Sequence, residues 1–523
     1  MTRNGKTLRF ASVTYGDALT YCFPGREFVL SKEPRTIHCP RGFLWPFPFV
    51  TVLLGDRGVT LIADAAQALT LQKDERDLAI TFEGTETVES VPHDGHFWSG
   101  ICAYRAHLVA VYGAPQPMPA YAAACFHVRR YFFHKRFCRQ AILENGGVHL
   151  RDIYDADCHA VGGIDAGLLF DYAYDVATDL RCGNDAPWHD DPALRPSLCA
   201  EIHALAQEGC TFFAYFDPWL IQDGSAWDRT LRGAAEVRDK NQEILRIWDL
   251  HQWHPCISYA AWRTTSLQYL KHVADLLPVS GLYLDECGNG TQFPCQNALH
   301  HHPEGETQTE REISYLLFLK ERLPFTHFLC EFAPDVRLAQ HFDIVLSDTR
   351  TTVNIYRFIL PHIRFVRIIH CDRPIGDDLM QVDLSFFNGE GIWLDNDLTD
   401  NAWISPRVRT AIRTQYAIQK AFVACFSSAD CEALVTPQAS RVLAHRFTDG
   451  KTSVYTFWNP LPRAISLPVL LPAGTQAELW YPARAPVVPS ANGDTCITLA
   501  AASAGCLVVC GVHARDVRFG CTK

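Results

Sequence analysis

The central part of the chain, residues 126–430, alternates short apolar runs with amphipathic stretches. We predict that the apolar runs are strands, at residues 168–174, 211–216, 281–284, 326–330, 343–346, 364–369 and 391–394. Residues 262–277 place Leu267, Leu270 and Val273 on one face at helical spacing. Strands that alternate with helices indicate a parallel sheet, and this number of units predicts a closed (β/α)8 barrel. The remaining strand is expected within residues 125–137.

Both ends of the chain instead predict antiparallel β structure. In residues 1–125, two apolar runs flank the turn Gly55-Asp56-Arg57-Gly58, and no strong helical period occurs. In residues 431–523, Thr448-Asp449-Gly450-Lys451 separates two further runs. We therefore predict an α/β fold of three domains: an N-terminal antiparallel β-sandwich (1–125), a (β/α)8 TIM barrel (126–430) and a C-terminal antiparallel β-sandwich (431–523).

Composition narrows the class of function. The net charge is −11 and no basic run occurs, which argues against nucleic acid as a partner. The sequence has no apolar stretch long enough for a membrane span and no apolar N-terminal segment typical of a signal peptide. The 20 cysteines follow no disulfide framework and are expected to be reduced thiols. We therefore expect a soluble, cytoplasmic protein with no membrane partner; its oligomeric state is left open.

Ionisable residues follow most of the predicted strands. They are Asp171, Asp217, Asp285, Glu286, Glu331, Asp348, His370 and Asp395. Aspartate also favours strand ends and helix caps for structural reasons, which is the better explanation for any single position. It explains less well the segment after Leu284, where an apolar strand leads directly into two acids. Because the active sites of barrels form at the C-terminal ends of the strands, we expect these residues to line one pocket.

A pocket rimmed with carboxylates is suited to the cleavage of glycosidic bonds. One carboxylate attacks the sugar or activates water, and a second carboxyl group protonates the leaving oxygen. Asp285 and Glu331 end consecutive strands, and we predict that they are the nucleophile and the acid/base. Asp348, one strand further along, is the alternative acid/base. If the strand stays extended, Glu286 points away from the pocket and supports Asp285 indirectly.

Aromatic residues near the same strand ends suit a sugar substrate, because aromatic rings pack on the apolar faces of sugars. Loop packing explains each single tryptophan about as well. The predicted substrate-binding residues are Asp171, Asp217, Trp219, Tyr283, Glu286, His370, Trp393 and Asp395. The predicted substrate is an oligosaccharide or another glycoside.

The segment from Cys287 to His302 contains two cysteines and three consecutive histidines. Their spacing matches no strong zinc motif, and a long specificity loop explains the segment better. We therefore assign no metal ligand and no cofactor, and we expect activity to need no metal ion.

Two alternatives to a glycosidase stay open. A metal-dependent barrel hydrolase would need an HxH pair that we do not find, and a carbohydrate-binding barrel without activity would keep the aromatic rim.

The segment Gly281-Leu282-Tyr283-Leu284-Asp285-Glu286 resembles the fourth-strand signature of retaining glycoside hydrolases with an aspartate nucleophile. In the α-amylase-like and endo-α-N-acetylgalactosaminidase-like families, the resemblance implies that the acid/base is Glu331. In the α-galactosidase-like clan, it implies Asp348. The α-amylase-like enzymes carry Arg two residues before the nucleophile and the α-galactosidase-like enzymes carry Lys, whereas this chain has Tyr283. The three-part layout is similar to that of uncharacterised bacterial glycosidase-like proteins.

Overall fold

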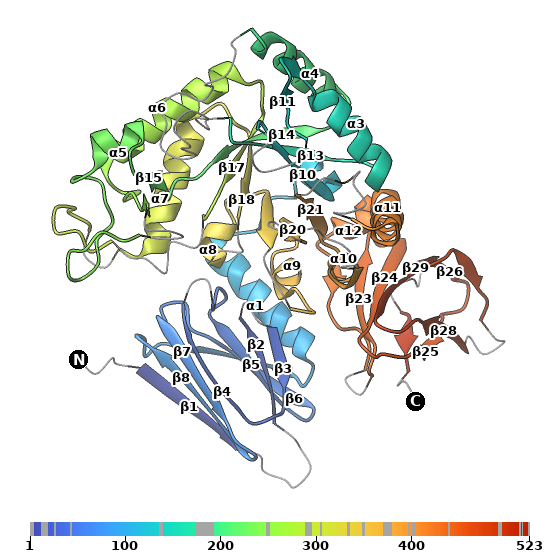
Figure 1. Ribbon diagram of the computed structural model, residues 1–523. Coiled ribbons are helices and arrows are strands. Elements are labelled where there is room, and N and C mark those ends of the chain that lie inside the picture. Colours follow the sequence, from blue (N-terminus) through green and yellow to red (C-terminus); the bar gives the residue numbers. More distant parts are fainter. Residues whose placement is uncertain are drawn as a thin grey trace.

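The computed structural model describes most of the chain. The described residues are 5–11, 19–25, 28–41, 44–134, 140–172, 193–246, 251–287, 295–303, 306–331, 335–347, 351–369, 379–395, 398, 404–437, 440–489, 494–511, 514 and 516–520. Three bodies make up the molecule: a central barrel, an N-terminal sandwich below it and a C-terminal sandwich beside both (Figure 1).

The central body is a closed barrel of parallel strands, which confirms the predicted fold class. In order around the barrel, the strands are β10 (His127–Phe132), β13 (Ala166–Phe170), β14 (Thr211–Phe216), β17 (Gly281–Leu284), β18 (His327–Cys330), β19 (Ile344–Ser347), β20 (Arg364–Ile368) and β21 (Gly391–Leu394). Strand β10 pairs with both β13 and β21 and so closes the barrel. It lies within residues 125–137, where the missing strand was expected.

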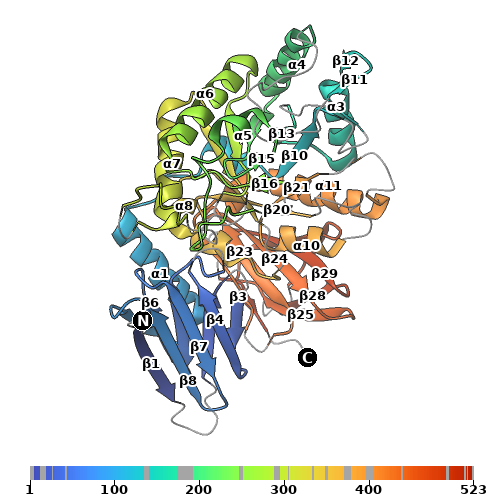
Figure 2. The same cartoon turned by 60° about the vertical axis from the view of Figure 1, so that its left-hand side comes forward.

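Helices cover the outside of the barrel (Figure 2). They are α3 (Leu150–Val161), α4 (Arg195–Gln207), α5 (Ala226–Leu231), α6 (Ala260–Leu276), α7 (Gln308–Arg322), α8 (Val336–Ala339), α9 (Ile355–Ile359), α10 (Leu379–Phe387), α11 (Pro406–Ala421) and α12 (Val423–Phe426). The Ser405 side chain accepts a hydrogen bond from the Val408 N–H and so caps α11. No helix in the described ranges is long and apolar enough to cross a membrane.

Side chains alternate between the inside and the outside of the barrel along each strand. On β17, Tyr283 belongs to the interior cluster, whereas Leu282 and Leu284 pack outside against the helices. The same alternation places Leu329 of β18 and Trp393 of β21 inside. The residues two positions further on in the chain are Asp285, Glu331 and Asp395, at the C-terminal ends of these strands.

The N-terminal body consists of two antiparallel sheets. One contains β1 (Gly5–Ala11), β8 (Asp77–Glu83), β7 (Ala68–Lys73) and β4 (Arg35–Pro40), and the other β3 (Phe28–Ser31), β2 (Thr20–Pro24), β5 (Phe49–Leu54), β6 (Arg57–Ile62) and β9 (Glu89–Asp94). The pairing of Leu54 with Arg57 places the predicted hairpin turn at Gly55-Asp56. Residues 1–125 therefore contain the expected sandwich strands.

Residues 1–125 also contain two helices that the sequence pattern did not predict. Helix α1 (Phe97–Tyr112) and the short α2 (Ala120–Ala124) connect the sandwich to β10. The buried residues of α1, which include Phe97, Ile101 and Tyr104, join a cluster that spans β5 and α9. Because the helix packs between two bodies, apolar residues surround much of it and no one-sided pattern marks it in the sequence.

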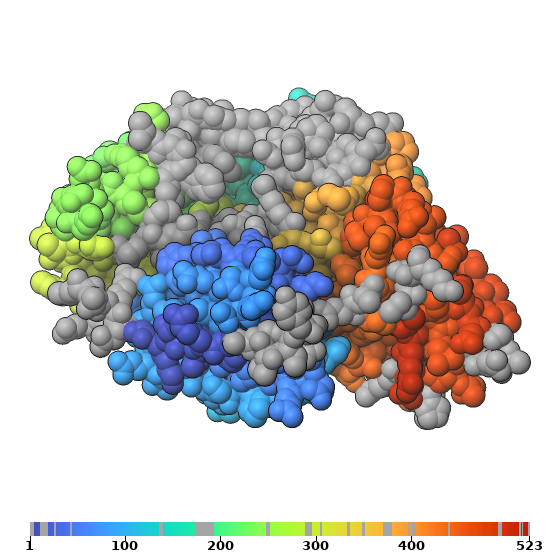
Figure 3. All heavy atoms as spheres, turned by 90° about the horizontal axis from the view of Figure 1, so that it is seen from below, coloured from blue at the N-terminus to red at the C-terminus, as the bar shows by residue number. Residues whose placement is uncertain are grey.

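The C-terminal body is a second sandwich, with β22 (Cys431–Glu432), β23 (Leu443–Thr448), β24 (Thr452–Asn459), β29 (Ser503–Cys510), β26 (Gln476–Tyr481) and β27 (Ala485–Val487) in one sheet. The other sheet contains β28 (Asp494–Leu499), β25 (Ile465–Leu470) and β30 (Arg518–Phe519). The predicted hairpin is confirmed as β23 and β24. Seen from below, the two sandwiches lie side by side under the barrel (Figure 3).

The N-terminal sandwich contacts the barrel at the end where the strands terminate. Arg41 forms an ion pair with Asp335, with 3.0 Å between Nε and Oδ2, and Val336 donates a backbone hydrogen bond to Pro46. Asp335 lies on the segment between β18 and α8, which begins at Glu331. The sandwich therefore supports one of the loops that follow the C-terminal ends of the strands.

Candidate active site

Asp285 lies at the C-terminal end of the fourth barrel strand, β17, with its side chain among hydrogen-bond donors. The hydroxyl of Tyr283 donates to Oδ1 at 2.6 Å, and the hydroxyl of Tyr215 donates to Oδ2 at 2.9 Å. Tyr215 belongs to the neighbouring strand β14. The backbone N–H of Asp285 donates to the carbonyl of Phe216 at 2.9 Å. Two strands therefore fix the position of this carboxylate.

Glu331 lies beside Asp285 because β17 and β18 are paired, with Leu284 opposite Cys330. The two carboxyl groups share a side-chain hydrogen bond. Burial and the neighbouring charge of Asp285 hold the pKa of Glu331 well above its usual range. Glu331 therefore holds its proton more strongly than an ordinary glutamate does. The structure brings together the two carboxyl groups that we predicted as the catalytic pair.

Glu286 does not continue the extended strand. Its φ is 56°, in the left-handed region, and the residue is buried. Its backbone N–H donates to Oε2 of Glu331 at 3.2 Å. The predicted orientation of the side chain depended on an extended strand, and the strand does not stay extended at this residue. The hydrogen bond between Glu286 and Glu331 is therefore made by the backbone of Glu286 and not by its side chain.

Aromatic rings line the barrel interior next to Asp285. The centroid distances are 5.9 Å between Tyr283 and Tyr215, 5.6 Å between Tyr283 and Phe170, and 5.4 Å between Tyr283 and Trp393. The indole N–H of Trp393 is buried and has no hydrogen-bond partner among the described residues. The barrel interior next to Asp285 is therefore a packed aromatic cluster that contains one buried polar donor.

Asp395 forms an ion pair with Arg130 of β10, whose Nη2 donates to Oδ2 at 2.6 Å. The guanidinium also lies over the ring of Phe170, with 4.9 Å to the centroid. Sequence reasoning placed Asp395 at the substrate but missed Arg130, because nothing in the sequence marks a charged residue on an otherwise apolar strand as a partner. The pair adds a fixed positive group next to the aromatic wall.

Three further predicted residues lie at the ends of β13 and β14 or just after them. Asp217 accepts a hydrogen bond from the backbone N–H of Trp219 at 2.8 Å, an Asx turn after β14. The ring of Trp219 is buried against His254, with 5.9 Å between centroids. Asp171 is buried at the end of β13 with a φ of 61°. The contacts seen for Asp217 and Trp219 are those of loop packing.

Asp348 and His370 lie outside the described residues. The last described residue before Asp348 is Ser347, which ends β19, the sixth barrel strand. The roles predicted for both residues stay predictions.

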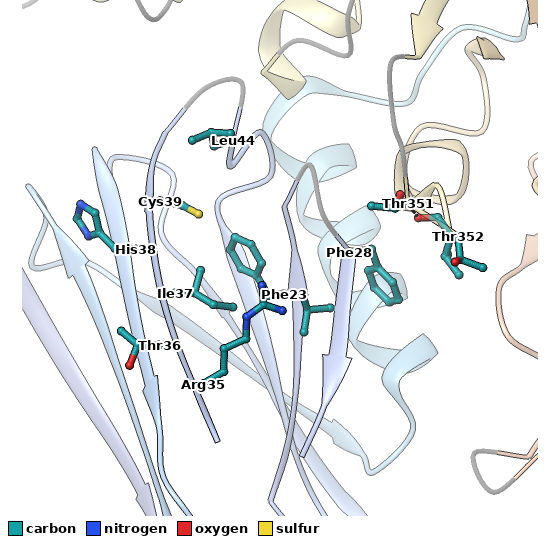
Figure 4. Close-up of a pocket in the computed structure, with 12 residues that line it drawn as sticks. Phe23, Phe28, Arg35, Thr36, Ile37, His38, Cys39, Leu44, Thr351 and Thr352 are labelled. Carbon is teal, nitrogen blue, oxygen red and sulfur yellow. Dashed lines mark hydrogen bonds between the residues drawn. The ribbon is translucent and has the colours of Figure 1, made fainter. Parts of the chain in front are cut away.

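A separate cavity of about 890 Å³ lies between the N-terminal sandwich and the segment that follows β19. Figure 4 shows Phe23, Arg35 and Ile37 on the sandwich side and Thr351 and Thr352 on the barrel side. None of its described lining residues belongs to the Asp285 group.

The only candidate metal ligands among the described residues also lie away from Asp285. They are Cys256, Cys295, His300 and His302, on the segments before α6 and α7.

Replacing Tyr283 with Phe removes one donor to Asp285. A hydrogen bond to a charged group contributes about 1.5–3 kcal/mol, so we expect kcat/KM on an aryl glycoside to fall roughly ten- to hundredfold. Tyr131→Phe is the control, because Tyr131 is a buried tyrosine of β10 whose hydroxyl makes no hydrogen bond among the described residues. Equal losses in the two variants would contradict a specific role of the Tyr283 hydroxyl.

The sequence matches no protein-family profile and no curated protein. The structure is similar to that of a substituted GH36 α-galactosidase AgaA from Geobacillus stearothermophilus bound to 1-deoxygalactonojirimycin, with 11% identity, a TM-score of 0.62, and coverage of 97% of this chain and 76% of that one. Other complexes of AgaA contain raffinose or stachyose.

Two other similar structures are an enzyme that degrades a carbohydrate and a protein bound to one. A cycloalternan-degrading enzyme from Trueperella pyogenes has 11% identity and a TM-score of 0.59, over 97% of this chain and 81% of that one. A variant of Kfla1895 bound to cyclobis-(1→6)-α-nigerosyl has 13% identity and a TM-score of 0.62, over 98% and 79%. The predicted resemblance to glycoside hydrolases is thus confirmed for the fold: nearly the whole chain is similar in structure to a GH36 α-galactosidase and to a cycloalternan-degrading enzyme.

Proposed function

We propose that the chain is a retaining glycoside hydrolase with Asp285 as its nucleophile. The observation that carries the proposal is the position of Asp285, at the inner end of the fourth strand between two tyrosine hydroxyls. A carboxylate held by donors from two strands is fixed in one orientation, as attack on an anomeric carbon requires. The aromatic residues next to Asp285 also fit a sugar substrate, because the apolar faces of sugars pack on aromatic rings.

For the acid/base, we propose Asp348 in preference to Glu331. Retaining enzymes place the two carboxyl groups about 5–5.5 Å apart, so that the glycosidic bond fits between them. A side-chain hydrogen bond joins Glu331 to Asp285, so the proton of Glu331 is directed at the nucleophile and not at a leaving group. Asp348 follows the sixth strand, the position implied by the α-galactosidase-like layout. We therefore propose that Glu331 holds a proton against the nucleophile and that Asp348 protonates the leaving group.

The reaction then follows in two steps. The Asp285 carboxylate forms a bond to the anomeric carbon while the glycosidic C–O bond breaks, and the leaving oxygen takes the proton of Asp348. Water then attacks the glycosyl-enzyme, gives its proton to Asp348 and releases Asp285. No step needs a metal ion.

The substrate proposed is an oligosaccharide with an α-linked galactose or glucose. The support is the set of ligands named for the similar structures, which include raffinose, stachyose and isomaltose. We place the protein in the cytoplasm, since the described cysteines are free thiols, as expected in a reducing compartment.

The test is turnover of aryl α- and β-glycosides of galactose and glucose, followed by proton NMR. We expect cleavage of an α-glycoside, with the α-anomer as the first product. The β-anomer as first product would contradict retention. Binding of sugars without turnover of any substrate would favour the alternative of a carbohydrate-binding barrel.

A further inference from the structure

Four side chains with metal-binding atoms meet on two loops beside the barrel. Cys256 precedes α6, and Cys295, His300 and His302 lie between β17 and α7. One ligand atom from each residue can be chosen so that all four lie within 4.8 Å of one another. Cys256, Cys295 and His300 are buried, and His302 is half-buried. Cys256 is separated from Cys295 by 39 positions, so the fold rather than a local motif assembles the group.

The spacing of the ligand atoms fits a tetrahedral zinc site. With Zn–S at about 2.3 Å and Zn–N at about 2.0–2.1 Å, a tetrahedral site has S···N edges of about 3.6 Å. Sγ of Cys256 lies 3.6 Å from Nε2 of His302, and Sγ of Cys295 lies 3.3 Å from Nδ1 of His300. These two S···N distances therefore agree with the expected 3.6 Å to within about 0.3 Å, a difference that small rotations of the side chains can remove.

The second ring nitrogen of His300 supports the same assignment. Nε2 lies 2.6 Å from the carbonyl oxygen of Ala234, which can only accept a hydrogen bond. The proton therefore lies on Nε2, and Nδ1 presents its lone pair toward the cysteine sulfurs. A histidine that binds a metal is usually oriented in this way, by a carbonyl or carboxylate on its other nitrogen.

One segment of backbone holds both loops in place. The carbonyl of Ala235 accepts from the N–H of Cys256 at 2.7 Å, and the carbonyl of Glu236 accepts from the side chain of Asn297 at 2.9 Å. With Ala234 bound to His300, three consecutive carbonyls fix residues on both sides of the group. The site is thus built from hydrogen-bonded backbone and is not a chance meeting of exposed side chains.

We propose that Cys256, Cys295, His300 and His302 bind one structural Zn²⁺ ion that joins the loop before α6 to the loop after β17. Two thiolates and two imidazoles favour zinc over calcium or magnesium, which take oxygen ligands. Four protein ligands fill a tetrahedral shell and leave no position for substrate or water, so the ion is structural. It would fix the loop that follows the nucleophile Asp285, because that loop carries three of the four ligands.

The first experiment measures metal in the full-length chain, purified without a polyhistidine tag and under reducing conditions. Elemental analysis is expected to find about one zinc per chain. After removal of zinc, added Co²⁺ should give the visible bands of a tetrahedral site and a thiolate-to-Co²⁺ band, and added Zn²⁺ should abolish them. Zinc removal should also lower Tm by several degrees, reversibly.

Matched variants locate the site. Cys295→Ser and His302→Ala should each weaken zinc binding by at least tenfold. His301→Ala is the control, because His301 lies between two proposed ligands but is exposed and outside the group. Cys287→Ser is a second control, for a buried thiol on the same loop. If Cys295→Ser fails to fold, His302→Ala can still be compared with His301→Ala, because His302 is only half-buried and its replacement disturbs the core less.

Three results would overturn the proposal: wild-type protein that contains no zinc and takes up no Co²⁺, Co²⁺ bands that persist in His302→Ala, or a disulfide between Cys256 and Cys295 in protein kept reduced during purification. These readouts do not depend on turnover. A protein that binds zinc but cleaves no glycoside would refute only the proposed function, and an active protein without zinc would refute only the metal site.

Discussion

Asp285→Asn is expected to lower kcat on an activated aryl glycoside by roughly 10³–10⁶-fold, the range seen when a nucleophile is removed from other enzymes. An amide does not attack the anomeric carbon, so no glycosyl-enzyme forms. The replacement keeps the size of the side chain, and its amide oxygen still accepts from one of the two tyrosine hydroxyls. Thermal unfolding should therefore stay close to that of the wild type.

Asp217→Asn is the matched control for this variant. Asp217 also follows a barrel strand, but its carboxylate accepts from the backbone N–H of Trp219, a bond that an amide oxygen keeps. We expect only a small change in kcat. Near-normal turnover of Asp285→Asn would exclude Asp285 as the nucleophile. A loss as large in Asp217→Asn would mean that any change at a strand end disturbs the pocket.

The sequence predicted the barrel well because its strands are short, apolar and separated by amphipathic helices. Strands β14, β17 and β21 begin and end at the predicted residues. Strand β10 was harder to place, since its sequence HVRRYF carries two arginines that are satisfied only by tertiary partners. These partners are Asp157 for Arg129 and Asp395 for Arg130.

The carboxylates of the site were predictable for a geometric reason. Alternation along a strand places every second residue inside the barrel, so an acid two positions after an interior residue faces the pocket. Asp285 and Glu331 were predicted because they end consecutive strands, and this alternation explains why both face the same side. It says nothing of Tyr215, whose contact with Asp285 depends on the register between β14 and β17. It does not extend to Glu286, where the backbone enters a left-handed conformation.

The zinc ligands could not be recognised from local spacing. The cysteine and histidines of residues 295–302 match no common motif by themselves, and the fourth ligand, Cys256, lies on the preceding loop. Only the packing of the segments before α6 and α7 brings it to the others. The expectation of no metal requirement concerned catalysis, and a closed structural site leaves that prediction for chelation experiments to test.

Because Glu331 holds a proton, the effect of replacing Glu331 on the stability of the protein should depend on pH. The pKa of Glu331 is raised in the folded protein, so the folded state keeps a proton that the unfolded chain releases. This contribution to stability is complete below the ordinary glutamate pKa, about 4.3, and is lost as the pH rises through the raised pKa. Glu331→Gln keeps the hydrogen bond to Asp285 without the titration. Its stability relative to the wild type should therefore increase with pH.

Azide rescue decides which carboxyl group is the acid/base, and we expect it in Asp348→Ala and not in Glu331→Ala. Without its acid/base, a retaining enzyme still forms the glycosyl-enzyme from a substrate with a good leaving group, but water then attacks slowly for want of a general base. Azide needs no base, so it should restore turnover in Asp348→Ala and give a glycosyl azide of retained configuration. Glu331→Ala removes a hydrogen-bonding partner of Asp285 and leaves the base in place, so azide should change neither its rate nor its product. Rescue of Glu331→Ala alone would mean that the two carboxyl groups separate when substrate binds, and that Glu331 is the proton donor after all.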